Sequence, residues 1–293
     1  MFKSKNLKPM LLKKVDKPFN DKNYIYELKF DGIRAILYTS KDEVVITNRH
    51  GVDITRLYPE LQNIKEIVGN RKVVFDGEIV TFDKDAHSFI ILQLRSHLKD
   101  INKIKRLSFE IPVAFIAFDI LYEGKGLINM TLNDRKKHLD KYRDTEYFIK
   151  SKVYNDGEKL FEKVKKLNLE GIVAKEKESL YIPGKRVYSW LKIKNFKVGN
   201  FLIHGYIKNK DKYSLLLGEY KNNKLYYVGK VSVTSKNKTL IKVLNSKKID
   251  NRFINYNENG IYVEPIYKIK VHYMEITDTN MLRQPFVKNK NKA

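Results

Sequence analysis

The chain contains no cysteine and no long apolar run, and both absences limit what it can be. Without cysteine, disulfide bonds, thiolate catalysis and cysteine-ligated metal sites are excluded. No run of apolar residues is long enough to span a bilayer. No hydrophobic signal core follows residues 1–5. We therefore expect a protein that is neither secreted nor embedded in a membrane.

Acidic residues are also scarce relative to basic ones. The 293 residues include 58 Lys and Arg but only 34 Asp and Glu, which gives a formal charge of +24. Such an excess predicts a polyanionic partner, with nucleic acid the first candidate and an anionic membrane surface the rival. A lysine-rich bias from an AT-rich genome, consistent with the many Asn, Ile and Tyr residues, also contributes. The length fits one large domain or two.

Hydrophobic periodicity predicts mixed elements up to residue 195. Thr131 with Asp134 is typical of a capping box, and Asp156 can cap another helix. The apolar run at 111–122 is typical of a buried strand. The expected elements are irregular chain at 8–23, strands over 24–82 around a helix at 58–68, a helix at about 88–106, a strand at 111–122, helices after Thr131 to Tyr142 and after Asp156, and strands at 171–175 and 187–194.

Beyond a boundary near residues 195–200, short strands separated by turns predict a small β-domain. An OB-type barrel is the main interpretation, and an SH3-like barrel or an irregular sandwich stays open. The expected strands are 201–208, 213–220, 224–233, 260–263 and 268–276, with a helix at 238–245. The expected turns are at 211, 222–223 and 257–260, and the tail at 287–293 is expected to be disordered.

Residues 27–34, Glu-Leu-Lys-Phe-Asp-Gly-Ile-Arg, are the most informative stretch. They place Lys29 beside a carboxylate, a glycine and a second cation, after a strand-like lead-in. Asp31 and Gly32 can form a tight turn that holds Lys29 at the mouth of a pocket. A lysine is a nucleophile only when deprotonated, a form that nearby cations, a metal and partial desolvation favour. An ordinary strand-turn with a solvent-facing lysine is the alternative.

Six further segments carry residues suited to phosphate chemistry. Strand alternation places Lys192 and Lys194 on one face, where two lysines can neutralise charge developing at phosphorus. Taken singly, each segment could be a turn, a core strand, a helix end or a solvated face. The segments are Thr-Asn-Arg-His-Gly at 47–51, Phe-Asp-Gly-Glu at 75–78, Ala-Phe-Asp-Ile-Leu at 117–121, Glu-Gly-Ile-Val-Ala-Lys at 170–175, Trp-Leu-Lys-Ile-Lys at 190–194 and Met-Leu-Arg-Gln-Pro-Phe at 281–286.

Together these segments resemble the signatures of the covalent nucleotidyltransferases, and their order and spacing resemble ATP-dependent DNA ligases of the compact viral, phage and bacterial accessory type. The resemblance covers residues 8–286. It implies an α+β adenylation domain of mainly antiparallel sheets with flanking helices over residues 1–196. An OB-type β-barrel domain with a short disordered tail would follow over residues 197–293.

The resemblance also implies residue roles. Lys29 would form the covalent nucleotide bond, and Lys192, Lys194 and Arg283 would help pyrophosphate to leave. The implied nucleotide-binding residues are Glu27, Arg34, Arg49, Glu78, Phe118, Glu170, Lys192 and Lys194. Of these, Glu27 would contact adenine and Phe118 would stack on it. Arg34 and Arg49 would lie near the ribose or phosphates of the nucleotide or nick, and Glu78 and Glu170 would hold Mg2+ or Mn2+.

The implied activity is the ATP-dependent sealing of nicks with a 5′-phosphate and a 3′-hydroxyl. The implied partner is nicked duplex DNA, and we expect a monomer in the cytoplasm or nucleoid, or their infected-cell equivalent, with no protein partner inferable. The alternatives are an mRNA guanylyltransferase, which would use GTP, an RNA ligase, and a catalytically inactive nucleic-acid-binding protein of the same fold. The Leu-Arg-x-Pro ending at residues 282–285 favours the DNA ligases.

Overall fold

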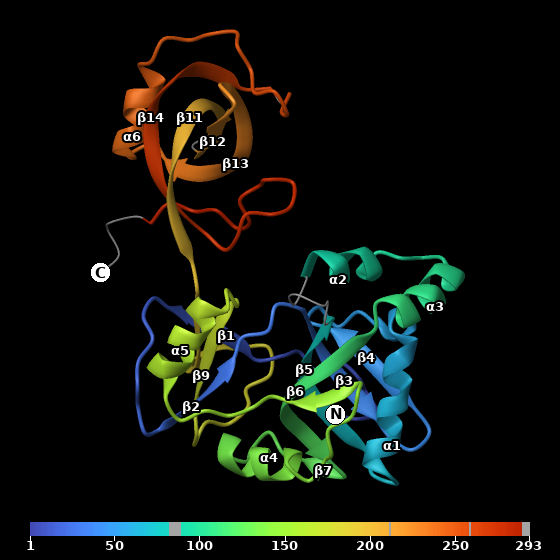
Figure 1. Cartoon of the computed structure of the whole chain (residues 1–293). Coiled ribbons are helices and arrows are strands. Elements are labelled where there is room, and N and C mark those ends of the chain that lie inside the picture. Colours follow the sequence, from blue (N-terminus) through green and yellow to red (C-terminus); the bar gives the residue numbers. More distant parts are fainter. Residues whose placement is uncertain (82–88, 211, 258, 289–293) are drawn as a thin grey trace. The chain divides into compact units, whose positions relative to one another are not determined.

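The computed structural model of this chain describes residues 1–81, 89–210, 212–257 and 259–288. The chain divides into two compact units, Met1–Asn195 and Phe196–Ala293 (Figure 1). Sequence expectations that fall on residues 82, 88, 211, 258 and 289–293 lie outside the described residues. Each unit is considered by itself below.

One sheet of the first unit joins segments that are far apart in the sequence. Its four strands have the order β1–β10–β9–β2. Their bounds are Leu11–Val15 (β1), Arg186–Lys194 (β10), Gly171–Glu176 (β9) and Tyr24–Leu28 (β2). The edge strand β1 shows that the expectation of irregular chain at 8–23 was wrong. Its sequence Leu-Leu-Lys-Lys-Val has neither alternation nor a long apolar run, so pairing with β10 creates a strand that local pattern does not indicate.

The second sheet of this unit contains six strands in the order β4–β3–β5–β6–β7, with β8 paired to β6. Its neighbours are antiparallel except for β6 and β8, which run parallel. All residues of β6 from Val113 to Leu121 are buried, which confirms the buried strand predicted from the apolar run. The bounds are Ile33–Thr39 (β3), Val44–Asn48 (β4), Val73–Thr81 (β5), Val113–Glu123 (β6), Lys125–Gly126 (β7) and Phe148–Lys150 (β8).

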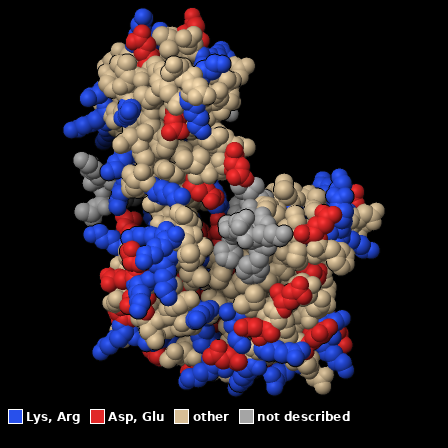
Figure 2. Space-filling model, viewed as in Figure 1, with Lys and Arg blue, Asp and Glu red and all other residues tan. Residues whose placement is uncertain are grey.

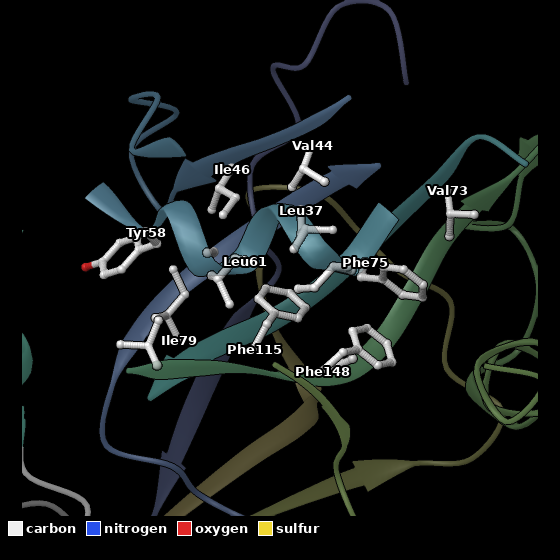
Figure 3. Packing of buried hydrophobic residues seen from close by; sticks show 14 of the residues in the cluster. Leu37, Val44, Ile46, Tyr58, Leu61, Val73, Phe75, Ile79, Phe115 and Phe148 are labelled. Atoms are coloured by element: carbon white, nitrogen blue, oxygen red, sulfur yellow. The ribbon is translucent and has the colours of Figure 1, made fainter. Parts of the chain in front are cut away.

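Apolar side chains of this sheet pack beneath a short helical segment (Figure 3). The expected α-helix at 58–68 is instead a 3-10 helix, Pro59–Ile64 (η2), followed by one α-helical turn, Lys65–Val68 (α1). Another 3-10 helix, Thr55–Leu57 (η1), precedes them. Tyr58, Leu61 and Ile64 are buried at intervals of three residues. That spacing suits a 3-10 helix, in which residues i and i+3 lie above one another.

Capping side chains begin three of the four remaining helices of the first unit. Thr131 and Asp156 accept backbone hydrogen bonds from Asp134 and Lys159, which confirms both predicted N-caps. The expected single helix at 88–106 is two helices, because Asp100 caps a new one by accepting from Asn102 and Lys103. The bounds are Phe89–Ser96 (α2), Ile101–Glu110 (α3), Leu132–Leu139 (α4) and Gly157–Lys166 (α5).

The second unit is a curved antiparallel sheet in the order β13–β12–β11–β14 (Figure 1). Its elements are Lys197–Asn209 (β11), Lys212–Lys221 (β12), Lys224–Thr234 (β13), Lys238–Leu244 (α6) and Ile261–Tyr273 (β14). One long strand, β14, replaces the two expected after residue 260. Asn222 and Asn223, both with positive φ, form the predicted turn between β12 and β13. Pairing among the described residues does not close these strands into a complete barrel.

Basic side chains are scattered over the surface visible in Figure 2 and form a group in the region of α5. That helix buries Leu160, Phe161 and Val164 and exposes its lysines to solvent. In the part of the chain that the structure describes, no helix is long and apolar enough to cross a membrane.

Candidate active site

Lys29 directly follows β2, where backbone contacts hold it beside two other strands. Its backbone N–H donates to the carbonyl oxygen of Gly171, with an N–O distance of 2.9 Å. The nearby Gly32 packs so tightly on β5 that an added Cβ would lie 2.2 Å from the Ile79 carbonyl oxygen and 2.9 Å from Cγ of Glu78. The motif glycine therefore permits an approach that any side chain would prevent, and it brings the Lys29 turn against Glu78.

A single carboxylate, that of Glu170, joins two of the predicted lysines. Its Oε2 lies 2.7 Å from Nζ of Lys29, and its Oε1 lies 2.7 Å from Nζ of Lys194. The next residue, Gly171, has φ of +154°, and a Cβ there would lie 2.1 Å from the Ile193 carbonyl oxygen. Because glycine tolerates this conformation and contact, β9 can start close enough to β10 for the three side chains to meet.

Burial and neighbouring charges shift the pKa values of two further predicted residues. Burial, together with the ammonium groups of Lys194 and Lys29, lowers the pKa of Lys192. Burial raises the pKa of the Glu78 carboxyl to about 7, although Lys29 and Arg34 oppose this shift. The site therefore contains an amine and a carboxyl that each take up their neutral form more readily than they would in water.

Glu27 of β2 is held between two lysines. Its side chain is 2% exposed, its Oε2 lies 2.9 Å from Nζ of Lys175, and its Oε1 forms an ion pair with Lys136. Burial alone would raise the pKa of this carboxyl, but the two ammonium groups outweigh burial and lower it. Glu27 is therefore an ionised hydrogen-bond acceptor. Burial lowers the pKa of Lys175 to about 8, since attraction to Glu27 only partly offsets it.

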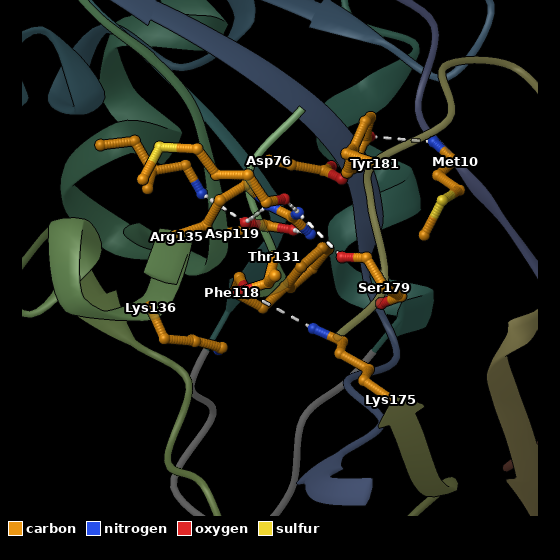
Figure 4. Close-up of polar contacts among 12 residues, drawn as sticks. Met10, Asp76, Phe118, Asp119, Thr131, Arg135, Lys136, Lys175, Ser179 and Tyr181 are labelled. Carbon is orange, nitrogen blue, oxygen red and sulfur yellow. Dashed lines mark hydrogen bonds and ion pairs between the residues drawn. The ribbon is translucent and has the colours of Figure 1, made fainter. Parts of the chain in front are cut away.

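Arg34 and Phe118 lie against each other. The guanidinium carbon of Arg34 is 4.3 Å from the centre of the Phe118 ring, and its Nε and Nη2 each donate to Asp76 at 2.7 Å. The Tyr181 hydroxyl also donates to Asp76, at 2.6 Å, and accepts from the backbone N–H of Met10 (Figure 4). Arg34 is thus fixed by a buried carboxylate.

Five of the predicted residues line one pocket. Its lining consists of Leu12, Glu27, Leu28, Lys29, Phe30, Arg34, Glu78, Phe118, Val173, Lys175 and Trp190. The pocket therefore combines apolar and aromatic walls with the turn that carries Lys29 and with the carboxyl groups of Glu27 and Glu78. Such a lining suits a small organic ligand bearing phosphate. Glu170 and Lys194 join this group through their contacts with Lys29.

Five predicted residues do not line this pocket. Three of them, Glu170, Lys192 and Lys194, lie close enough to Lys29 to interact with it. The other two are Arg49 and Arg283. Arg49 lies in the exposed turn after β4, where its Nε donates to the His50 ring at 3.1 Å. Arg283 belongs to the second unit, where its Nη1 lies 3.0 Å from Oε1 of Glu275. Its backbone N–H also donates to the Glu275 carbonyl oxygen.

Family models cover most of the chain. Residues 9–194 match the ATP dependent DNA ligase domain, and residues 208–291 match the ATP dependent DNA ligase C terminal region. The chain belongs to the ATP-dependent DNA ligase family.

Individual relatives agree with this assignment. The ligase is 34% identical to the SPbeta prophage-derived DNA ligase-like protein LigB of Bacillus subtilis over 211 residues, which cover 71% of this chain and 74% of that protein. It is 28% identical to the multifunctional non-homologous end joining protein LigD of Mycolicibacterium smegmatis over 289 residues, 91% of this chain but 36% of that protein. The chain thus spans about a third of the length of LigD.

Solved structures show the same fold. A mycobacterial DNA ligase D complexed with ATP and MES has 27% identity and a TM-score of 0.60, over 98% of this chain and 96% of that one. A Lig E DNA ligase structure has a TM-score of 0.63 at 16% identity, over 96% of this chain and 98% of that one, which supports the fold alone. The expected fold class, an adenylation domain followed by an OB-type domain, is confirmed.

The carboxyl groups of this ligase suit a hard divalent cation. Mg2+ favours oxygen ligands, keeps several waters, and usually binds through one or two carboxylates plus substrate phosphates. Within the described ranges, no cluster of three or more His, Cys, Asp or Glu residues could hold a metal. Glu78 and Glu170 lie close enough for Glu170 to raise the pKa of Glu78. Two carboxylates with substrate oxygens therefore fit such an ion, whereas a site built from protein ligands alone does not.

Several contacts around the pocket have no counterpart in the sequence analysis. Asp76 and Lys175 lie within the quoted motifs, so their positions could have indicated them, but no role was predicted for either. Lys136 and Tyr181 lie in segments without a motif. Only folding brings these residues to the pocket region, because their partners are distant in sequence.

Proposed function

We propose that this ligase seals nicks in duplex DNA through a covalent bond between Lys29 and AMP, followed by a DNA-adenylate. The observation that carries the proposal is the arrangement around Lys29. Its amine lies at a pocket with an aromatic wall, beside the Glu170 carboxylate and within the field of Lys192 and Lys194. An amine nucleophile, a pocket with an aromatic wall and surrounding cations are what nucleotidyl transfer from ATP requires.

The proposed chemistry has three displacements at phosphorus. The Nζ lone pair of Lys29 attacks the α-phosphorus of ATP, pyrophosphate leaves, and the nitrogen loses its proton to solvent. A 5′-phosphate oxygen at the nick then attacks the same phosphorus, the P–N bond breaks, and the amine takes up a proton. Finally the 3′-hydroxyl attacks the activated 5′-phosphorus, loses its proton, and AMP leaves. Positioning and charge neutralisation provide most of the catalysis in such steps.

The remaining residue roles are part of the same proposal. Lys192, Lys194 and Arg283 would stabilise the charge on the α-phosphate and on departing pyrophosphate. Glu78 and Glu170 would hold Mg2+ or Mn2+, which when bound supplies charge neutralisation at the phosphates. The proposed nucleotide contacts are Glu27 and Phe118 with adenine and Arg34, Arg49, Glu78 and Glu170 with the ribose or phosphates.

We assign adenylation to residues 1–196 and an OB-type DNA-binding role to residues 197–293. The proposed partner is nicked duplex DNA, bound by a monomer. The charge of +24 supports a polyanionic substrate, because each phosphate neutralised by a lysine or arginine adds affinity that falls as salt rises.

The test is to incubate the protein with Mg2+ and α-labelled ATP or GTP, separate it on a denaturing gel, and chase with singly nicked DNA. We expect an adduct from ATP that disappears as the nick is sealed. Lys29→Ala should form no adduct, whereas the exposed Lys41→Ala should behave as wild type. An adduct on Lys29→Ala would refute the assignment of the nucleophile. A label from GTP alone would indicate a guanylyltransferase.

A further inference from the structure

The ion pair between Glu27 and Lys136 has no function in the reaction described above. Lys136 lies on α4, its side chain is 11% exposed, and it is not part of the pocket lining. Glu27 and Lys175 do line the pocket. Lys136 therefore contacts Glu27 from outside the pocket lining.

The helix that carries Lys136 is fixed firmly. Arg135, the preceding residue, donates from Nε and Nη2 to the two carboxylate oxygens of Asp119, each at 2.8 Å. The first turn of α4 donates from Leu132 to the Ser179 carbonyl oxygen and from Asn133 to that of Lys177. These acceptors follow β9, the strand that carries Lys175 (Figure 4). The two lysines thus approach Glu27 from elements that are bonded to each other.

The number of acceptor sites on the carboxylate limits what Glu27 can do. An ionised carboxylate has two oxygens with about four lone-pair directions. Lys136 and Lys175 each contact a different oxygen, so each oxygen retains capacity for one more donor. With both oxygens fixed, the carboxylate presents an ordered acceptor to the pocket rather than a rotating one.

We propose that Lys136 is a positioning residue that fixes Glu27 as a reader of an exocyclic amino group on the nucleotide base. This inference rests on the proposed use of ATP and extends it to base selection. A 6-amino group donates to the fixed carboxylate, whereas a 6-oxo group presents a second acceptor and is repelled. A base with hydrogen at that position leaves the buried carboxylate without the donor.

The test compares ATP with purine riboside triphosphate, which lacks the 6-amino group, and with ITP, which has a 6-oxo group. The variant is Lys136→Met, and the matched control is Lys137→Met, which removes the same charge from a neighbouring side chain that is 73% exposed. We expect Lys136→Met to reduce the preference for ATP over purine riboside triphosphate by about tenfold or more, mainly through KM, since a bond to an ionised group is lost or misaligned. Lys137→Met should keep the wild-type preference.

A double-mutant cycle distinguishes positioning from a general structural effect. If Lys136 acts through Glu27, Lys136→Met should have little further effect on base preference in a Glu27→Gln background. An unchanged preference in Lys136→Met, or additive losses in the double mutant, would overturn the proposal. A variant that only unfolds more easily, with wild-type preference at low temperature, would also overturn it.

The proposal can be tested separately from the ligase reaction. Calorimetric titration of the wild type and the two methionine variants with ATP and purine riboside triphosphate measures base preference without adduct formation. If the wild type forms no adduct but Lys136→Met still loses its preference in binding, the proposed reaction fails and the inference on Lys136 stands. If the wild type forms the adduct normally and Lys136→Met keeps the wild-type binding preference, the proposed reaction stands and the inference on Lys136 fails.

Discussion

Replacement of Arg135 by methionine should unfold the first unit at a much lower denaturant concentration. Arg135 and Asp119 are both fully buried, and the guanidinium also donates to the carbonyl oxygens of Met130 and Ser179. Among the described residues, the Asp119 carboxylate accepts hydrogen bonds from Arg135 and from the Ile120 N–H, so in Arg135→Met only the bond from Ile120 remains. Removal of one partner of a buried pair costs about 3–5 kcal/mol, because it leaves an uncompensated charge.

Trp190 offers a direct assay. It is the only tryptophan in the chain and is fully buried in the first unit, so its fluorescence reports the unfolding of that unit. With an m-value of about 2–3 kcal/mol per M urea, the expected loss lowers the unfolding midpoint by about 1–2.5 M. The exposed Arg143→Met is the matched control and should change the midpoint little.

A charge-neutral double variant tests the reasoning itself. Asp119→Leu combined with Arg135→Met removes both charges and should be more stable than Arg135→Met alone, because no isolated charge remains. A midpoint for Arg135→Met close to that of wild type would refute the reasoning. So would a double variant as unstable as the sum of the two single changes, since the cost would then not arise from an unpaired charge.

Two further predictions concern the candidate site. Burial raises the pKa of Glu78 from its ordinary value of 4.5 to about 7, so the folded state binds more protons than the unfolded state between these pH values. Stability therefore falls as pH rises through this range. In EDTA, Glu78→Gln should therefore be more stable than wild type at pH 8 and lose this advantage toward pH 5; parallel curves would contradict the shift. Gly171→Ala should lower stability and slow adenylation, because its Cβ would meet the Ile193 carbonyl oxygen, whereas Gly126→Ala, with nothing within 4 Å, should not. Urea titrations measure the stability changes in both predictions, and the rate of adduct formation measures the effect of Gly171→Ala on adenylation.

Local sequence signals predicted many elements correctly because their causes are local. The caps at Thr131 and Asp156 bond to backbone groups three residues away, and the Asn222–Asn223 turn depends only on residues that tolerate positive φ. The errors arose where tertiary contacts dominate. β1 exists because β10 pairs with it. The segment at 59–64 is a 3-10 helix whose buried apolar residues pack into the core cluster of the six-stranded sheet.

The family, the candidate nucleophile and the order of the motifs could be read from the amino-acid sequence, because these are short patterns of residue types along the chain. The sequence could not determine which charges meet. Only the folded chain brings Glu170 to both Lys29 and Lys194, and only it joins Glu27 to Lys175 across 148 positions. Ion pairs depend on distances of a few ångströms in three dimensions, and those distances are set by strand pairing and by the anchoring of α4, neither of which a local pattern encodes.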